Sequence, residues 1–190
     1  MSVENERKLL LDVSRAHELL TQLRNCGDVK LFDVTQGYLN GAGRIRHMVP
    51  HKQTNMISES FLFTYKARVQ GSVVEIETSI DIHDYQKLFL IAKPWLVKTR
   101  AKLQQGIYTW DIDFFRTPKQ GNIYLCMAEV EMPEFEVDCP DILPILQPYA
   151  TQWVDNNDKR FNNKNLCDAK KTTKLLASLA GNGHEKTNLA

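Results

Sequence analysis

Apolar residues alternate with polar ones along most of the chain, a period-two pattern that is typical of half-buried β-strands. The clearest run is Trp-Asp-Ile-Asp-Phe-Phe at 110–115. There Trp110, Ile112 and Phe114 would form one face of a strand, opposite Asp111 and Asp113. The same pattern, bounded by turn residues, predicts about eight strands, at residues 3–11, 31–39, 44–46, 61–68, 73–80, 96–103, 107–115 and 123–132.

A helical period appears in fewer places. Residues 12–23 carry apolar side chains at helical spacing, ending before Gly27. Further helices are predicted at residues 81–92, 141–154 and 168–179, and a loop containing Pro50 is predicted at 48–60. Because strands outnumber helices, the pattern predicts an α+β protein built on an antiparallel sheet or barrel.

Composition narrows the class of protein. The 190 residues include 43% hydrophobic and 25% charged residues, which indicates a single globular domain and excludes a disordered chain. With 24 Lys+Arg against 23 Asp+Glu, the net charge of +1 excludes a uniformly basic nucleic-acid binder. The charged N-terminal residues, the four scattered cysteines and the lack of an apolar run of about 18 residues lead us to expect a cytoplasmic protein without membrane contact.

Charged residues recur two positions apart on the predicted strands, and one sign is doubled in each pair. The pairs are Glu4 and Glu6, Arg44 and Arg46, Glu75 and Glu77, Lys98 and Arg100, Asp111 and Asp113, and Glu129 and Glu131. A solvated sheet face, with cross-strand pairs worth ~0.2–1 kcal/mol, explains any single pair. The repeated doubling is harder to explain in this way, because like charges side by side destabilise a fold unless something neutralises them.

The two sets of charges suit two different ligands. The cations Lys8, Arg44, Arg46, Lys66, Lys98 and Arg100 would match a polyphosphate of about four or five negative charges. The acids Glu4, Glu6, Asp113, Glu129 and Glu131 offer the hard oxygen ligands that Mg²⁺ or Mn²⁺ takes beside a phosphate. Closing the sheet with these faces inward would make a charged tunnel.

These motifs resemble the CYTH, or triphosphate tunnel metalloenzyme, superfamily. The resemblance rests on Glu4-Asn5-Glu6-Arg7-Lys8 and on the motifs that follow it in order. These are Arg44-Ile45-Arg46, Thr64-Tyr65-Lys66, Glu75-Ile76-Glu77, Lys98-Thr99-Arg100, Trp110 to Phe115, Ala128 to Glu131 and Asp158 to Phe161. One departure is Val73, where many triphosphatase relatives have arginine.

The resemblance implies an eight-stranded antiparallel β tunnel, a closed barrel with a charged interior and helices packed outside. The tunnel domain would span residues 1–167, and 168–190 would form a C-terminal helix and a flexible tail. By position, Glu4, Glu6 and Lys8 would be catalytic, and the six cations named above would bind the substrate. Glu4, Glu6, Asp113, Glu129 and Glu131 would hold Mg²⁺ or Mn²⁺.

The expected activity is metal-dependent hydrolysis of inorganic triphosphate or a related organic triphosphate, most like the bacterial inorganic triphosphatase branch. Two alternatives stay open from the sequence. One is a class IV-type adenylate cyclase, and the other is a non-catalytic protein that binds polyphosphate or a nucleotide. Nucleic acid is not an expected partner, except as an RNA 5′ triphosphate end, and the sequence does not determine the oligomeric state.

Overall fold

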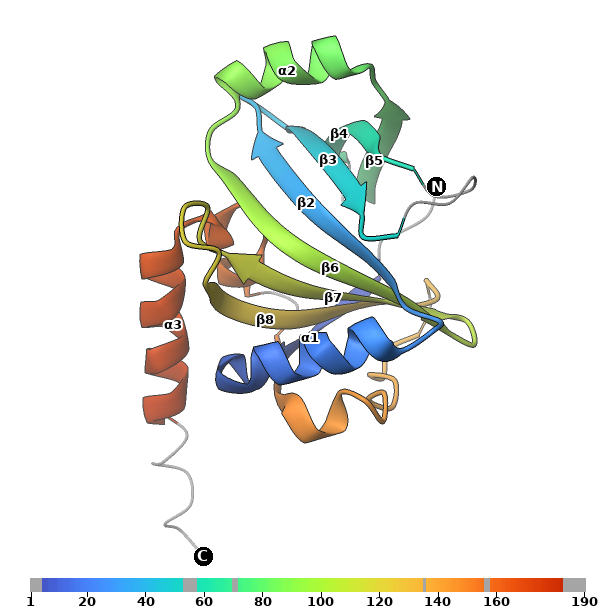
Figure 1. Ribbon diagram of the computed structural model, residues 1–190, viewed down its shortest axis with the longest axis vertical. Helices are drawn as coiled ribbons and strands as arrows, with labels where there is room; N and C mark the ends of the chain where they lie inside the picture. The colour runs from blue at the N-terminus through green and yellow to red at the C-terminus, as the bar shows by residue number, and fades with distance from the viewer. Residues whose placement is uncertain (1–4, 53–57, 70–71, 135, 156–157, 183–190) are drawn as a thin grey trace, which may run out of the picture.

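The computed structural model describes residues 5–52, 58–69, 72–134, 136–155 and 158–182. Within them the chain forms one antiparallel nine-stranded sheet, ordered β5-β4-β3-β2-β6-β7-β8-β1-β9, with three α-helices around it (Figure 1). The strands are β1 (Glu6–Leu11), β2 (Lys30–Tyr38), β3 (Gly43–Pro50), β4 (Ser60–Val69), β5 (Ser72–Ser79), β6 (Trp95–Gln105), β7 (Tyr108–Arg116), β8 (Ile123–Glu131) and β9 (Ala150–Val154). The helices are α1 (Ala16–Asn25), α2 (Ile82–Ile91) and α3 (Ala169–Asn182). The predicted α+β class is confirmed.

The sheet is open, and this corrects the closed eight-stranded barrel expected from the sequence. Among the described residues, β5 pairs only with β4, and β9 pairs only with β1. β1 uses one edge for β8 and the other for β9. Because the short β9 takes the second edge of β1, the sheet curls around a cavity without its two ends pairing.

The strand β9 corrects a second expectation, a helix over residues 141–154. Pro148 interrupts any such helix, because proline lacks the backbone N–H that a helix interior needs. The residues after it favour a strand, and the edge of β1 supplies the hydrogen-bond partners, with Leu9 opposite Trp153 and Lys8 opposite Val154. Tertiary pairing therefore decided the conformation of this segment.

The loop predicted at residues 48–60 begins later than expected. β3 extends to Pro50, so the first residues of the predicted 48–60 loop are part of a strand. Residues 53–57 of that loop lie outside the described residues.

The outer face of the sheet carries most of the hydrophobic core. Trp110, Ile112 and Phe114 are fully buried, as the alternation in β7 predicted, and they belong to one cluster with the apolar face of α1. A second cluster, around Phe115, lies at one end of the inner face, because Phe115 is two residues from Asp113 on β7, and it receives the leucines of α3. A third cluster, around Tyr85, joins α2 to the outer face of β3 and β4. No helix in the described part of the chain is both long and apolar enough to cross a membrane.

A buried ionic network joins β6 to β7 on the inner face. Asp113 is 0% exposed and accepts hydrogen bonds from Lys98 Nζ at 2.6 Å and from Arg100 Nε and Nη2 at 2.7 and 2.6 Å. Burial alone would raise the pKa of Asp113, but the charges of Arg100 and Lys98 outweigh it and lower that pKa. The fixed guanidinium also donates to Asp111 at 2.5 Å and lies 3.4 Å from Glu129. The network therefore sets the direction of Arg100.

Replacing Asp113 with asparagine should destabilise the fold strongly, because two buried cations would lose their counter-charge. We expect Asp113→Asn to lower the free energy of unfolding by about 3–5 kcal/mol. Urea unfolding followed by circular dichroism measures this. Lys102→Met is the control, since Lys102 is 37% exposed and its pair with Asp111 should contribute at most about 1 kcal/mol. Equal losses in the two variants would contradict the role given to Asp113.

Candidate functional site

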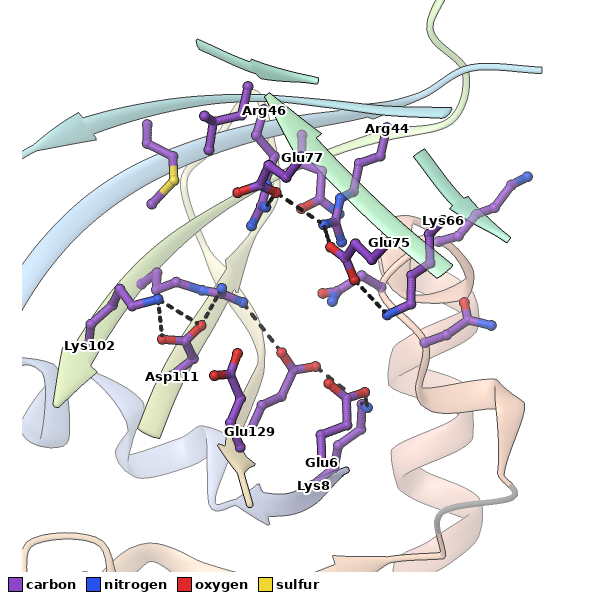
Figure 2. A pocket seen from close by; sticks show the side chains of 18 of the residues that line it. Glu6, Lys8, Arg44, Arg46, Lys66, Glu75, Glu77, Lys102, Asp111 and Glu129 are labelled. Carbon is purple, nitrogen blue, oxygen red and sulfur yellow. Dashed lines mark hydrogen bonds and ion pairs between the residues drawn. The ribbon is translucent and has the colours of Figure 1, made fainter. Parts of the chain in front are cut away.

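The inner face of the curled sheet surrounds a cavity of about 910 Å³ (Figure 2). Side chains from β1 to β8 line it, together with residues 162–164, which lie between the last strand and α3. Seven lysine and arginine side chains face six carboxylates there, a net formal charge of +1. The cations are Lys8, Arg44, Arg46, Lys66, Arg100, Lys102 and Lys164, and the acids are Glu6, Glu75, Glu77, Asp111, Glu129 and Glu131.

One wall of the cavity is a row of cations on β3 and β4. Arg44 Nη2 lies 3.1 Å from Glu75 Oε1, Lys66 Nζ lies 3.3 Å from Glu75 Oε2, and Arg46 pairs with Glu77. The acids on β5 do not satisfy every N–H donor of these arginines. The buried Nε atoms of Arg44 and Arg46 have no hydrogen-bond partner among the described residues. Burial and the neighbouring charge of Arg44 lower the pKa of Arg46. The wall retains donors and positive potential for an anion.

The facing wall, on β1 and β8, gathers carboxylates. Glu6 lies opposite Glu131 in the strand register, and Lys8 lies opposite Glu129. Burial and the neighbouring carboxylates raise the pKa of Glu129, although Lys8 Nζ lies 3.8 Å and Arg100 Nη2 3.4 Å from it. For Glu6, burial raises the pKa, but the charge and hydrogen bond of Lys8 outweigh it and lower that pKa. Negative charge is therefore crowded on this wall.

The carboxylate wall suits a divalent cation in its donor chemistry. Glu6, Glu129 and Glu131 offer oxygen ligands of the kind that Mg²⁺ and Mn²⁺ prefer. In the described residues, no group of three or more carboxylate, histidine or cysteine side chains lies in ligating proximity. Lys8 and Arg100 instead occupy positions between the acids. A triphosphate of about four or five negative charges would exceed the +1 of the lining, and a divalent cation would offset part of the difference.

Most of the site residues predicted from the sequence meet at this cavity. Those that line it are Glu6, Lys8, Arg44, Arg46, Lys66, Arg100, Glu129 and Glu131. Lys98 and Asp113 do not line it; they lie beneath it with side chains 1% and 0% exposed. Lys98 Nζ lies 3.3 Å from Asn163 Oδ1, so it links the sheet to a segment that lines the cavity. Glu4 lies outside the described residues.

The cavity also contains residues that the sequence prediction of the site missed. Lys102 continues the period-two series of Lys98 and Arg100, so the pattern contained a signal for it. Its Nζ lies 3.1 Å from Asp111 Oδ1. Lys164 follows a short 3-10 turn and lies 6.0 Å above the Tyr38 ring centre, and no strand pattern could have indicated it.

The buried Lys98 should make stability depend on pH. Burial and then the charge of Arg100 lower its pKa to about 8, below the ordinary 10.5. Between these pH values the unfolded chain binds a proton at Lys98 that the folded chain does not. The contribution of Lys98 to the free energy of unfolding should therefore rise from pH 8 to pH 10.5 and stay constant below pH 8.

The comparison of wild type with Lys98→Met isolates this contribution. Urea unfolding of both proteins at closely spaced pH values should show wild type gaining stability relative to the variant within that window. Parallel pH profiles would contradict the assignment.

No protein-family model matches the sequence, and no curated protein matches it. Solved structures resemble the fold at low identity. A candidate adenylate cyclase from Bacillus halodurans shares 16% identity over 69% of this chain and 81% of that chain, with a TM-score of 0.43. A candidate adenylyl cyclase from Hippeastrum, described as having a dominant triphosphatase activity, shares 14% over 68% and 79%, with a TM-score of 0.41. A chain of the Schizosaccharomyces pombe Mediator head module shares 7% over 95% of both chains, with a TM-score of 0.45.

Proposed function

We propose that the cavity binds a triphosphate together with Mg²⁺ or Mn²⁺ and hydrolyses its terminal phosphoanhydride bond. This is the activity implied by the resemblance to the triphosphate tunnel metalloenzymes. The observation that carries the proposal is the pairing of two unlike walls across one cavity. One wall has buried arginine N–H donors that have no partner among the described residues, and the other has crowded carboxylates, one of them with a raised pKa. A polyanion with its metal satisfies both walls.

Binding would begin with the cations. Arg44 and Arg46 line the cavity, so a bound phosphate would compete with Glu75 and Glu77 for their terminal N–H donors. Arginine suits this role, because its planar donors match the spacing of phosphate oxygens. Arg100 faces the phosphate chain from the other side of the cavity, held in place by the network beneath it. Contact from several directions restricts the triphosphate to a few orientations.

The acids provide the second half of the site. Glu6, Glu129 and Glu131 would hold the divalent cation, which would draw electron density from the terminal phosphoryl group and shield its charge from an incoming water. Lys8 lies beside Glu6 and Glu129, so its ammonium is placed to stabilise negative charge that develops on the phosphoryl oxygens.

The bond changes are those of phosphoryl transfer to water. The water oxygen forms a bond to the terminal phosphorus as the bond from that phosphorus to the bridging oxygen breaks. The bridging oxygen leaves with the electron pair, and the proton of the water passes to a carboxylate of the acidic wall. The products are orthophosphate and the shortened diphosphate. The chain's own contribution is positioning and charge stabilisation, and no covalent intermediate is needed.

Phosphate release from inorganic triphosphate and from ATP, with Mg²⁺ or Mn²⁺ present, tests this proposal. Glu129→Gln and Glu131→Gln should each lower kcat/KM by about a hundredfold or more, because each removes a carboxylate from the acidic wall without changing its size. Asp28→Asn is the matched control, since Asp28 is an exposed carboxylate outside the cavity. It should keep wild-type activity.

Chromatography of the ATP products distinguishes hydrolysis from cyclisation. ADP with orthophosphate supports the proposal, whereas cyclic AMP with diphosphate would identify a cyclase. Full activity in both glutamine variants, or wild-type activity that survives complete removal of divalent cations by EDTA, would overturn the proposed role of the acidic wall.

A further inference from the structure

The cavity has two chemically different ends. In Figure 2, Lys66 lies toward one end and Lys102 toward the other, and Arg44 and Arg46 succeed one another in that direction. Side chains two apart on a strand share a face, so Met48 continues the row beyond Arg46. The row of cations on β3 therefore ends in an apolar side chain at the Lys102 end.

A second apolar side chain lies beside it. Leu62 on β4 is opposite Arg46 in the strand register and lines the cavity, while its neighbours Phe61 and Phe63 pack against the third core cluster under α2. Neither Met48 nor Leu62 belongs to any of the three hydrophobic clusters formed by the described residues. Two half-buried apolar side chains thus face a charged cavity, where a phosphate chain gives them nothing to pack against.

The Lys66 end does not offer the same surface. Its aromatic residue, Tyr38, has Lys164 Nζ 6.0 Å above its ring centre, and its hydroxyl accepts a hydrogen bond from Gln36 Nε2 at 2.5 Å. The other lining residues contributed by the segment before α3 are Asn162 and Asn163. That end is polar and its aromatic ring is already covered by a cation.

Polar groups line the same cavity as the apolar pair. Lys102 and Asp111, 3.1 Å apart, lie at the same end and offer both a donor and an acceptor. An apolar surface facing a few polar groups is the usual composition of a site for an organic ligand. The volume of about 910 Å³ also lies within the range of about 300–1,000 Å³ that such pockets span. Inorganic triphosphate alone would leave this end unused.

We propose that the Met48–Leu62 end holds the organic group of an organic triphosphate, with a planar ring packed on these two side chains and its triphosphate along the cationic row. This inference rests on the proposed function and specifies its substrate class. Thioether sulfur packs well against aromatic rings, and the unbranched methionine side chain adapts to rings of different shape. The site therefore selects for the ring and the phosphates together.

The test compares substrates in one double variant, Met48→Gln with Leu62→Asn, which keeps the side-chain sizes but removes the apolar surface. We expect kcat/KM for ATP, for thiamine triphosphate, or for both to fall about tenfold or more, while that for inorganic triphosphate stays within about twofold. Calorimetric titration with a β,γ-imido analogue of ATP should show the same weakening without turnover. The two organic substrates identify which ring the site prefers.

Ile76→Asn is the matched control, because Ile76 is 58% exposed on β5 and does not line the cavity. It should leave all three substrates unchanged. An equal loss for organic and inorganic triphosphate in the double variant would overturn the inference, as would wild-type protein that prefers inorganic triphosphate over both organic ones. Absence of phosphate release from every triphosphate would instead refute the proposed function. The inference about the Met48–Leu62 end would then stand only if titration showed that the double variant binds the analogue more weakly than wild type.

Discussion

The bidentate pair between Arg100 and Asp113 is the interaction on which the cavity depends. It places a fully buried carboxylate against two cations on the neighbouring strand, so neither strand can shift by one residue without leaving a charge unpaired. The same pair points the guanidinium toward Asp111 and Glu129 in the cavity. The buried charges therefore fix the orientation of the charged side chains that line the cavity.

The charged cavity is bounded by an open sheet whose two edge strands are β5 and β9. β9 covers the outer edge of β1, and β5 forms the opposite edge of the sheet with its glutamates turned toward the arginines of β3. The acids on β5 and the acids on β8 therefore face the cations from different sides. They are not equivalent: the first set forms ion pairs with the arginine row, whereas the second is crowded enough that the pKa of Glu129 rises. A polyanion and a divalent cation would each meet a different one of these environments.

Much of the sheet and of the site could be predicted because side-chain direction in a strand follows from sequence parity alone. The alternation at Trp110 to Phe114 predicted which side chains are buried in the core and which face inward. The alternation of side chains does not show how deeply each one is buried. Lys98 and Arg100 share a face of β6, yet only Arg100 lines the cavity, because Lys98 lies under the segment that contains Asn163. Lys164 was also beyond prediction, since it reaches the cavity from an irregular segment without a strand pattern.

The sequence by itself determined the antiparallel strands, their charged inner faces and the near-equality of positive and negative charge, because these depend on local alternation and residue type. The tertiary structure decided that the sheet stays open, that residues 150–154 form a strand, and which charges are buried as supports. These outcomes depend on which edge of β1 is free and on how far each side chain lies from water. Both are properties of the assembled sheet and are encoded in no single segment.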